Sequence, residues 1–471
     1  YFEPLDFEFV KNIIDKENEI GEVSGIVVQF GGQTPLRIAN KLKEYDYKIL
    51  GTSFDAIDIS EDREKFQKLI FEIGLKQPKS DISIGTKELL NKSEKLNFPI
   101  LLRPSYVIGG RMMEKMNNLS DVKDYIDQNY WALENNVILI DEFLKDATEV
   151  DVDILRDNQG SVMIAGIMEH IEEAGIHSGD SACSIPTFSL NKNTINEIKK
   201  FTINLANSLQ TIGLMNVQYA VKDDEIYILE ANPRASRTIP FLAKAIGIPF
   251  IRIAASLIAG NTINKELLKI DTNVLPYYAI KEAVFPFNKF PNTDVILGPE
   301  MKSTGEVMGI DKDFDMAFLK SQLAAGQRIN NIKNIFISVK DDDKDAILAI
   351  VKELSEYEFN IYTTKGTNLF LKNNNINSIV INKVVEGSPH IVEYLSQSKI
   401  DLVINTTENK QAIRDSFTIR RTAVDLNVPY YTNLRSAKIL CKSIIKLKNT
   451  ELEVKPIQKH HIYSNKNSFE F

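Results

Sequence analysis

Short apolar runs alternate with amphipathic segments along most of the chain, a pattern typical of an α/β protein. The first apolar run, at 22–32, ends in Gly31-Gly32 and predicts a strand, and a helix is predicted from Thr34. A second strand is predicted at 47–51. Because this is only one strand-helix-strand step, we expect residues 1–54 to be the incomplete end of a Rossmann-like α/β domain.

The middle of the chain predicts a mixture of strands and helices. A helix is predicted after Ser60, as its N-cap, and ends at Gly74. Further apolar patterns predict strands at 99–104, 137–140, 150–155 and 164–169 and helices within 195–209 and 240–260. Residues 286–309 are rich in Pro, Asn and Gly and predict loops. A polar stretch at 326–333 predicts a domain boundary, which gives a second domain at 55–327.

Strands and helices alternate again after this boundary. Strands are predicted at 335–339, 360–362, 379–381 and 402–405, and helices at 343–357 and 410–426. Residues 328–471 are therefore expected to form a compact α/β domain of an ordinary size.

The most informative polar cluster lies in a hairpin predicted from 215 to 230. Glu230 and Asn232 share one face of a strand, because side chains alternate. Gln218 can join them only if the turn has an odd number of residues, so we expect a turn at 223–225 that places Gln218 opposite Glu230. Three oxygen-bearing side chains on one face suit a hard cation such as Mg²⁺.

Arg234 and Arg237 follow the hairpin directly. Guanidinium groups bind phosphoryl or carboxylate groups in a bidentate manner, so this stretch predicts an anion site beside the cation site. The alternative is a hairpin end with solvated polar residues, which the clustering of five such side chains disfavours.

Three loops offer weaker candidates. Gly109-Gly110, after Arg103, could close over phosphates, although a plain hairpin loop has the same pattern. The acidic residues that follow 137–140 could bind a ribose or simply be solvated. His177, in the polar loop 175–181, is the one histidine of five that lies among candidate site residues, and the alternative is a histidine without a role.

Composition narrows the function classes. The net charge of −8 has no compensating basic run, which argues against a nucleic-acid surface. Two cysteines exclude a disulfide framework, and the most apolar stretch, 246–260, is too short to span a bilayer. We therefore expect a cytoplasmic protein without membrane contact. The chain does not begin with Met, so we expect it to be a fragment.

Several motifs carry a family resemblance. They are Gly-Gly-Gln-Thr-Pro-Leu at 31–36, Arg-Pro-Ser-Tyr-Val-Ile-Gly-Gly-Arg at 103–111, the stretch 168–184, Met-Asn-Val-Gln at 215–218 and Glu-Ala-Asn-Pro-Arg-Ala-Ser-Arg at 230–237. With these motifs the chain resembles the second, carbamate-phosphorylating half of the large subunit of carbamoyl phosphate synthetase. The resemblance implies a partial pre-ATP-grasp domain (1–54), an ATP-grasp domain (55–327) and a regulatory domain similar to methylglyoxal synthase (328–471).

The resemblance also implies an activity. Carbamate would be phosphorylated by ATP, as part of carbamoyl phosphate synthesis from bicarbonate, ammonia or glutamine and two ATP, for pyrimidine or arginine biosynthesis. Two Mg²⁺ or Mn²⁺ ions and a K⁺ ion would assist. The implied partners are the N-terminal half of the large subunit and a glutaminase.

The resemblance assigns roles to individual residues. The implied nucleotide-binding residues are Arg63, Arg103, Gly109, Gly110, Glu142, Leu144, Glu149, Gly175, Ile176, His177, Ser178, Gln218 and Glu230. The implied metal ligands are Gln218, Glu230 and Asn232, and Arg234 and Arg237 would face the phosphoryl and carbamate groups.

Two effector sites are implied in the same way. A nucleotide such as UMP or IMP would bind Lys344, Thr364, Thr367, Lys383, Asn405 and Thr407, and ornithine would bind Glu172, Asp180, Glu282 and Thr432.

Two other classes compete with this interpretation. Another ATP-grasp carboxylase would use a similar metal hairpin but would not end in this kind of domain. An inactive metabolite sensor would not need the intact polar cluster. The last domain lacks a convincing Asp/His/Asp set for methylglyoxal synthesis, so we interpret it as regulatory.

Overall fold

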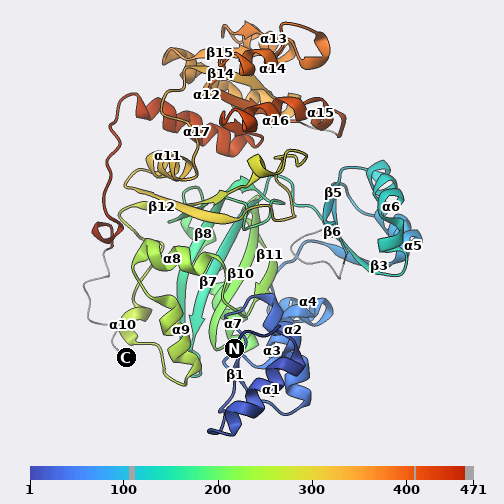
Figure 1. The fold of residues 1–471 in the computed structure, drawn as a ribbon, viewed down its shortest axis with the longest axis vertical. Helices are drawn as coiled ribbons and strands as arrows, with labels where there is room; N and C mark the ends of the chain where they lie inside the picture. Colours follow the sequence, from blue (N-terminus) through green and yellow to red (C-terminus); the bar gives the residue numbers. More distant parts are fainter. Residues whose placement is uncertain (105–111, 408–409, 462–471) are drawn as a thin grey trace.

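The computed structural model describes residues 1–104, 112–407 and 410–461. Figure 1 shows the small N-terminal domain at one end, a large sheet in the centre, a separate lobe beside the sheet and the C-terminal domain at the other end.

The N-terminal domain contains the predicted strand-helix-strand step. Strands β1 (Ile26–Val27) and β2 (Ile49–Leu50) are parallel neighbours. The helices around them are α1 (Phe7–Asn18), α2 (Gln33–Glu44) and α3 (Phe54–Glu61). The prediction that Ser60 is the N-cap of the next helix is wrong. Ser60 lies inside α3, where its hydroxyl donates to the Ala56 carbonyl, and Asp62 caps α4 (Arg63–Glu72).

The central sheet has seven strands in the order β11-β10-β7-β8-β9-β12-β13, and all pairings are antiparallel. The strands are β7 (Thr148–Arg156), β8 (Val162–Glu173), β9 (Cys183–Ile185), β10 (Gly213–Lys222), β11 (Glu225–Asn232), β12 (Tyr278–Val284) and β13 (Gly305–Asp311). The apolar patterns predicted four of these strands. They missed β9 and β12, and they placed the start of β13 in a loop.

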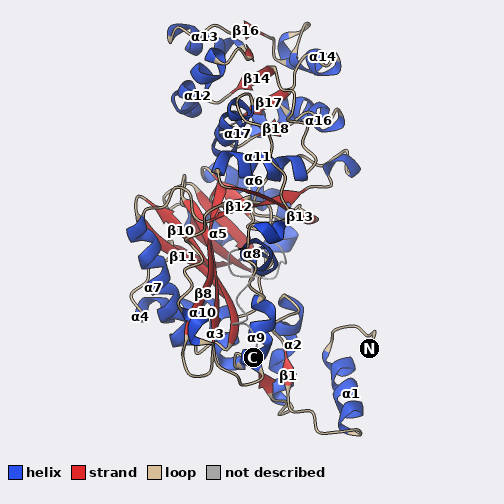
Figure 2. Cartoon of the chain, turned by 90° about the vertical axis from the view of Figure 1, so that its left-hand side faces the viewer, coloured by secondary structure: helices blue, strands red, loops and turns tan. Residues whose placement is uncertain are grey.

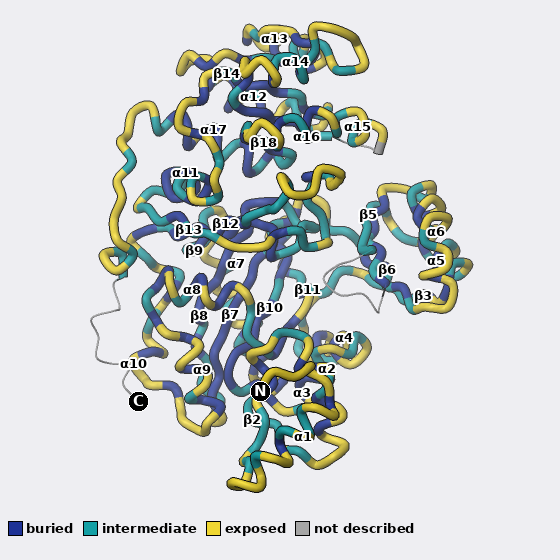
Figure 3. Tube along the Cα trace, in the orientation of Figure 1, coloured by how far each residue is buried: buried dark blue, intermediate teal, exposed yellow. Residues whose placement is uncertain are grey.

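Helices cover the two faces of the central sheet (Figure 2). One face packs on α7 (Lys192–Leu209), with Val152 and Val217 in a shared core. The other packs on α8 (Thr238–Ile246) and α9 (Phe250–Ile258), and the short α10 (Lys265–Leu268) follows. Figure 3 shows that β7, β8 and β10 are largely buried between these layers.

The side lobe is a four-stranded antiparallel sheet in the order β3-β6-β4-β5. Its elements are β3 (Ser80–Ile84), α5 (Gly85–Ser93), β4 (Ile100–Pro104), β5 (Glu114–Met116), α6 (Leu119–Leu133) and β6 (Val137–Glu142). The predicted Gly109-Gly110 loop falls between β4 and β5, at 105–111, and lies outside the described residues.

The C-terminal domain has a parallel five-stranded sheet in the order β16-β15-β14-β17-β18. Its strands are β14 (Asn334–Ser338), β15 (Asn360–Thr363), β16 (Ile379–Val380), β17 (Leu402–Asn405) and β18 (Tyr430–Tyr431). Its helices are α12 (Lys344–Glu356), α13 (Lys365–Asn373), α14 (Ile391–Ser396), α15 (Lys410–Asp415), α16 (Phe417–Asp425) and α17 (Leu434–Leu447). The single helix predicted at 410–426 is therefore two helices, which separate at Ser416.

The C-terminal and central domains share one core. Phe318 of α11 (Phe314–Ala324) and Ile335 of β14 belong to the same buried cluster. By length and composition, no single helix of the described chain could cross a membrane, although α8 and α9 pass that test as a pair bent by 117°.

Candidate active site

The turn of the β10–β11 hairpin has two residues, so the predicted odd turn is wrong. Lys222 pairs with Glu225, and Asp223 and Asp224 both have positive φ, as in a tight two-residue turn. In a regular ladder this turn would pair Gln218 with Leu229. A β-bulge shifts the register so that Gln218 pairs with Glu230 instead. The predicted pairing is therefore present, but the bulge produces it.

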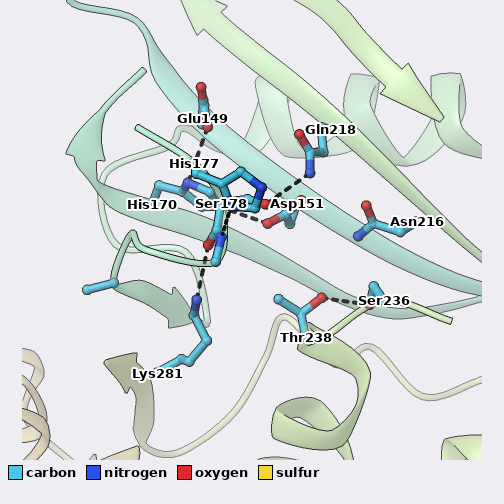
Figure 4. A network of polar contacts seen from close by, with 12 residues as sticks. Glu149, Asp151, His170, His177, Ser178, Asn216, Gln218, Ser236, Thr238 and Lys281 are labelled. Atoms are coloured by element: carbon cyan, nitrogen blue, oxygen red, sulfur yellow. Dashed lines mark hydrogen bonds and ion pairs between the residues drawn. The ribbon is translucent and has the colours of Figure 1, made fainter. Parts of the chain in front are cut away.

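Of the predicted metal ligands, Glu230 and Asn232 lie at the end of β11, and Gln218 lies beside Glu230 in the middle of β10. The Asn232 Nδ2 donates to the Glu230 Oε1 (2.8 Å), and the Gln218 Nε2 donates to the Ser178 hydroxyl (3.2 Å; Figure 4). Within the described ranges, no group of three or more His, Cys, Asp or Glu side chains could hold a metal ion. One carboxylate and two amide oxygens nevertheless fit Mg²⁺, which completes its shell with water and phosphate oxygens.

Arg234 is held by residues of two domains. Its Nε donates to the Gln33 Oε1 of the N-terminal domain (3.0 Å), and its Nη2 donates to the Asn232 Oδ1 (3.0 Å). Nearby, the Ala235 N–H donates to the Gln29 carbonyl (3.0 Å). The N-terminal domain therefore fixes the segment that follows β11, a contact that local sequence patterns do not reveal.

Arg237 is exposed, and its guanidinium contacts the Met301 sulfur. The backbone of Gly179 lies close by, because a Cβ added there would be 3.5 Å from the Arg237 Nη1. Arg237 thus reaches toward the loop 175–181, which carries four of the predicted nucleotide-binding residues.

Acidic side chains alternate along β7 and line the same face of the sheet as Gln218. Asp151 pairs across the ladder with Gln218, and its Oδ2 lies 2.8 Å from the His170 Nε2 (Figure 4). Burial alone would lower the pKa of His170, but hydrogen bonds and charges from Asp151 and Glu149 outweigh it and raise the pKa to about 9. The imidazole is therefore charged at neutral pH.

His170 and Asp151 were not among the predicted site residues, and the interpretation that only His177 lies in the site is wrong. The alternation of Glu149, Asp151 and Asp153 within an otherwise apolar strand is the signal that could have located Asp151. Burial raises the pKa of Asp153 to about 6, and hydrogen bonds from Thr238 and Ser236 limit the rise.

Hydrogen bonds hold the loop 175–181 against the face of the sheet that carries Glu149 and Gln218. The Gly175 N–H donates to the Glu149 Oε1 (3.0 Å), and the Lys281 Nζ donates to the Ser178 carbonyl (3.1 Å; Figure 4). Within the loop, the Gly179 N–H donates to the His177 Nδ1 (3.0 Å), and burial lowers the pKa of His177. Predicted residues 175–178 are thus placed beside Gln218.

Arg63 and Arg103 meet at a carboxylate in the side lobe. Both guanidinium groups pair with Asp141, which is 7% exposed, and the Arg103 Nη2 is 2.6 Å from its Oδ2. Burial lowers the pKa of Arg63, and the nearby Arg103 adds to this effect. The buried Arg103 Nε has no partner among the described residues. Two cations on one carboxylate leave a positive charge that suits phosphate groups.

Two other predicted nucleotide contacts lie where the side lobe joins the central sheet. Glu142 ends β6, and its N–H donates to the Lys79 carbonyl (2.8 Å). Leu144 follows, and its carbonyl accepts from the Ala147 N–H (3.3 Å).

A buried acidic cluster lies between the central and C-terminal domains. Glu172 and Glu282 are both buried, and burial together with their mutual repulsion raises the pKa of Glu282; burial likewise raises that of Glu172. Gln322 donates to Glu282 and accepts from the Tyr431 hydroxyl (2.8 Å). The predicted Thr432 follows Tyr431 in the chain. The structure thus brings Glu172, Glu282 and Tyr431 together, whereas Asp180 accepts the N–H groups of Lys302 and Ser303.

The other predicted effector residues follow the carboxyl ends of β14, β15, β16 and β17. Thr364 is hydrogen-bonded to Ser338 (3.2 Å), and the Asn405 Nδ2 donates to the Ser338 carbonyl (3.1 Å). The Asn405 Oδ1 is buried without a partner in the described chain. A Cβ at Gly366 would lie 3.9 Å from the Lys344 Nζ. The rest of the predicted set is Thr367, Lys383 and Thr407.

Residues 285–304, which we name the connecting segment, contact both the C-terminal domain and the candidate active site. The buried Arg420 pairs with Asp294. At the other end of the segment, the His177 N–H donates to the Gly298 carbonyl (2.8 Å), and the Ser303 N–H donates to Asp180 (2.9 Å).

The seven-stranded antiparallel sheet with its separate four-stranded lobe is the ATP-grasp fold. The structure is similar to the biotin carboxylase domain of Hydrogenobacter thermophilus 2-oxoglutarate carboxylase in complex with MgADP, ADP and bicarbonate (TM-score 0.54, 14% identity, 69% of this chain and 78% of that chain). It is also similar to Campylobacter jejuni biotin carboxylase in complex with β-γ-ATP (TM-score 0.51, 15% identity, 66% and 76%). At these identities the likeness establishes the fold alone.

Family models cover three parts of the chain. They are the carbamoyl phosphate synthase preATP-grasp domain at 1–59, the carbamoyl-phosphate synthase L chain ATP binding domain at 62–266 and an MGS-like domain at 346–432. The C-terminal section of the carbamoyl phosphate synthase large chain of Aquifex aeolicus is 44% identical over 477 residues, covering 98% of this chain and 88% of that protein. The chain therefore belongs to the carbamoyl phosphate synthase large chain family.

Other large chains that it matches are longer than this chain. Those of Myxococcus xanthus and Archaeoglobus fulgidus are each 47% identical over 98% of this chain, which spans 42% of their length.

Proposed function

We propose that the chain catalyses the ATP-dependent phosphorylation of carbamate to carbamoyl phosphate. The observation that carries this proposal is the gathering of Gln218, Glu230, Asn232 and Arg234 at one edge of the central sheet, with Arg237 beside them. A carbamate oxygen attacks the γ-phosphorus of ATP as the bond to ADP breaks. Carbamate is itself the nucleophile, so the protein needs only to align the reactants and neutralise charge.

Each part of the site has a task in this reaction. Arg103 and Arg63, which share Asp141, bind the nucleotide phosphates from the side lobe. Arg234 and Arg237 face the phosphoryl and carbamate groups. Gln218, Glu230 and Asn232 would hold Mg²⁺ or Mn²⁺, which supplies positive charge for the phosphate oxygens when bound. The fastened loop 175–181 limits the access of water that would hydrolyse ATP.

Two regulatory sites belong to the proposal. The polar groups around Ser338, with Lys344 and the unpartnered Asn405 Oδ1, suit a nucleotide monophosphate such as UMP or IMP. The buried pair Glu172 and Glu282 suits the amino groups of ornithine, because a cation relieves their repulsion.

The reaction is one step of a longer synthesis. We infer that carbamate is supplied by an N-terminal half of the large chain, and ammonia by a glutaminase, for pyrimidine or arginine biosynthesis. The requirement for K⁺ and a cytoplasmic location stay predictions.

The test is the reverse reaction in the full-length protein that carries this chain. ATP formation from ADP and carbamoyl phosphate is followed with and without UMP, IMP and ornithine. We expect carbamoyl phosphate-dependent ATP formation that the effectors change. A folded protein that forms no ATP but carboxylates biotin would place the chain with the other ATP-grasp carboxylases.

A further inference from the structure

Asp153 is a buried carboxylate that only neutral groups bind. It lies in β7, is 1% exposed and accepts hydrogen bonds from the Ser236 hydroxyl (2.7 Å), the Thr238 hydroxyl (2.5 Å) and the Asn216 Nδ2 (3.2 Å). In the part of the chain that is described, no lysine, arginine or histidine forms an ion pair with it. A buried carboxylate is costly unless its hydrogen bonds are complete, so its role lies in the groups that it holds.

Two of these groups flank Arg237. Ser236 and Thr238 both donate their hydroxyl protons to Asp153, and the two hydroxyl oxygens lie 2.8 Å apart (Figure 4). Arg237 lies between them in the chain, and its side chain contacts Met301 instead. The Ser236 hydroxyl further accepts from the Ile239 N–H (3.2 Å) in the first turn of α8. One carboxylate therefore fixes both the turn after β11 and the start of α8.

The third group connects Asp153 to the candidate metal ligands. Asn216 is the ladder partner of Asp153 on β7 and of Asn232 on β11. A row of three paired positions thus runs across the sheet from the carboxylate to a predicted metal ligand. Asp153 ties this row to the turn that carries the arginines.

We infer that Asp153 is a positioning residue that fixes the β11–α8 turn so that Arg237 meets the transferred phosphoryl group. The effect on phosphoryl transfer rests on the proposed function, but the rigidity of the turn can be measured separately. Asp153 does not touch the reactants and acts through Ser236 and Thr238.

The principal test is Asp153→Asn in the full-length protein. Asparagine has the same shape as aspartate. Its amide group, however, donates hydrogen bonds where the carboxylate accepts them from the hydroxyls of Ser236 and Thr238. In ATP synthesis from ADP and carbamoyl phosphate, we expect kcat to fall about thirtyfold, because small displacements of catalytic groups are costly. KM for ADP should stay within about twofold, because none of the three side chains bonded to Asp153 is a predicted nucleotide-binding residue. Thr238→Val, which removes one donor at constant shape, should lower kcat about fivefold.

Asp157→Asn is the matched control. Asp157 is also fully buried at the end of β7, but it accepts backbone N–H groups of Gln159, Ser161 and Ile263 away from the arginines. This variant should lower Tm and leave kcat unchanged. Hydrogen exchange of a peptide that spans 233–239 should accelerate in Asp153→Asn and Thr238→Val but not in the control.

The outcomes separate the inference from the proposed function. Wild-type kcat or unchanged exchange in a folded Asp153→Asn variant would overturn the inference. If Asp153→Asn does not fold, the test is made with Thr238→Val. A wild-type kcat in Thr238→Val would then overturn the inference. If the wild-type protein forms no ATP, the proposed function fails, and the exchange comparison alone decides whether Asp153 fixes the turn.

Discussion

At the scale of single residues, Arg234 is more constrained than an exposed arginine. It bonds to Gln33 in one direction and to Asn232 in the other. Such preorganisation means that little rearrangement is needed when charge develops on the phosphoryl group. The position of the guanidinium, and not its charge alone, is then expected to matter.

Glu230→Gln and Arg234→Ala test this expectation. Each should lower the rate of ATP formation from ADP and carbamoyl phosphate about a hundredfold, because one preorganised contact with the transition state contributes about 3 kcal/mol. Rates are measured at saturating substrate, and circular dichroism confirms that the variants are folded. A wild-type rate in either variant would contradict the assignment of the site.

Glu282 predicts a pH dependence of stability. Its folded-state pKa is raised above the unfolded value to about 8, so between these values the unfolded state binds fewer protons. The free energy of unfolding should therefore fall as pH rises from about 6 to about 7.5, by at most about 1.4 kcal/mol per pH unit from this group. His170 adds a fall of the same sign, because its raised pKa stabilises the fold below about pH 6.5 and this contribution is lost toward about pH 9.

Glu282→Gln isolates the first contribution. Urea unfolding at about pH 6 and pH 7.5 should show a smaller fall in the free energy of unfolding in the variant than in the wild type. The contribution of His170 remains in both proteins. Equal slopes would show that Glu282 does not hold its proton in the folded state.

At the scale of elements, the β10–β11 hairpin shows what local patterns can predict. The polar residues of the two strands and the arginines that follow them were sufficient to predict that Gln218, Glu230, Asn232 and Arg234 gather. The bulge was not predictable, because alternation alone assumes a regular ladder. Strand β9 has only three residues, too few for a periodic signal, and β12 joins the sheet through partners distant in the chain.

The same limit applies to the site. Residues close together in the chain, such as Arg234 and Arg237, could be proposed from the sequence. The acidic alternation along β7 marks Asp151, but nothing in the sequence marks His170, whose place depends on its buried contact with Asp151 on the neighbouring strand. The contact of Gln33 with Arg234 joins positions 201 residues apart, which no local pattern encodes.

The tight turn of the hairpin predicts a stabilising substitution. Asp224 has φ of 61°, a conformation that glycine adopts without strain. Asp224→Gly should raise the free energy of unfolding by about 0.5–1 kcal/mol, and water replaces the exposed hydrogen bond from Asn191. Asp224→Val should lower it by more than about 1 kcal/mol. Urea unfolding measures both, and a destabilised glycine variant would contradict the turn geometry.

At the scale of the whole molecule, the pair between Arg420 and Asp294 joins two domains. The Arg420 side chain is 1% exposed, so removing its partner leaves a buried charge without compensation. Asp294→Asn should destabilise the protein by about 2–3 kcal/mol, because Asp294 keeps some contact with solvent.

The neighbouring Arg421 provides the control for this prediction. Its partner Asp425, one helical turn away, is 54% exposed, and Arg421 also donates to the Phe287 carbonyl. The pair should therefore contribute only about 0.3–0.5 kcal/mol, and Asp425→Asn should unfold nearly like the wild-type protein. Thermal unfolding compares the two variants. An equal fall in Tm in Asp294→Asn and Asp425→Asn would show that the pair between the domains is no stronger than the pair within the helix.

The connecting segment has a consequence for how its length can vary. Surface loops normally accept insertions and deletions because their ends alone are fixed. The connecting segment is also fixed in its interior. Asp294 pairs with Arg420 of the C-terminal domain, and the Gly298 carbonyl accepts from the His177 N–H of the central domain. One residue inserted between these points would break either the pair with Arg420 or the contact with His177. A chimera that exchanges the C-terminal domain should therefore keep residues 294–298 at their present length and carry a matching arginine.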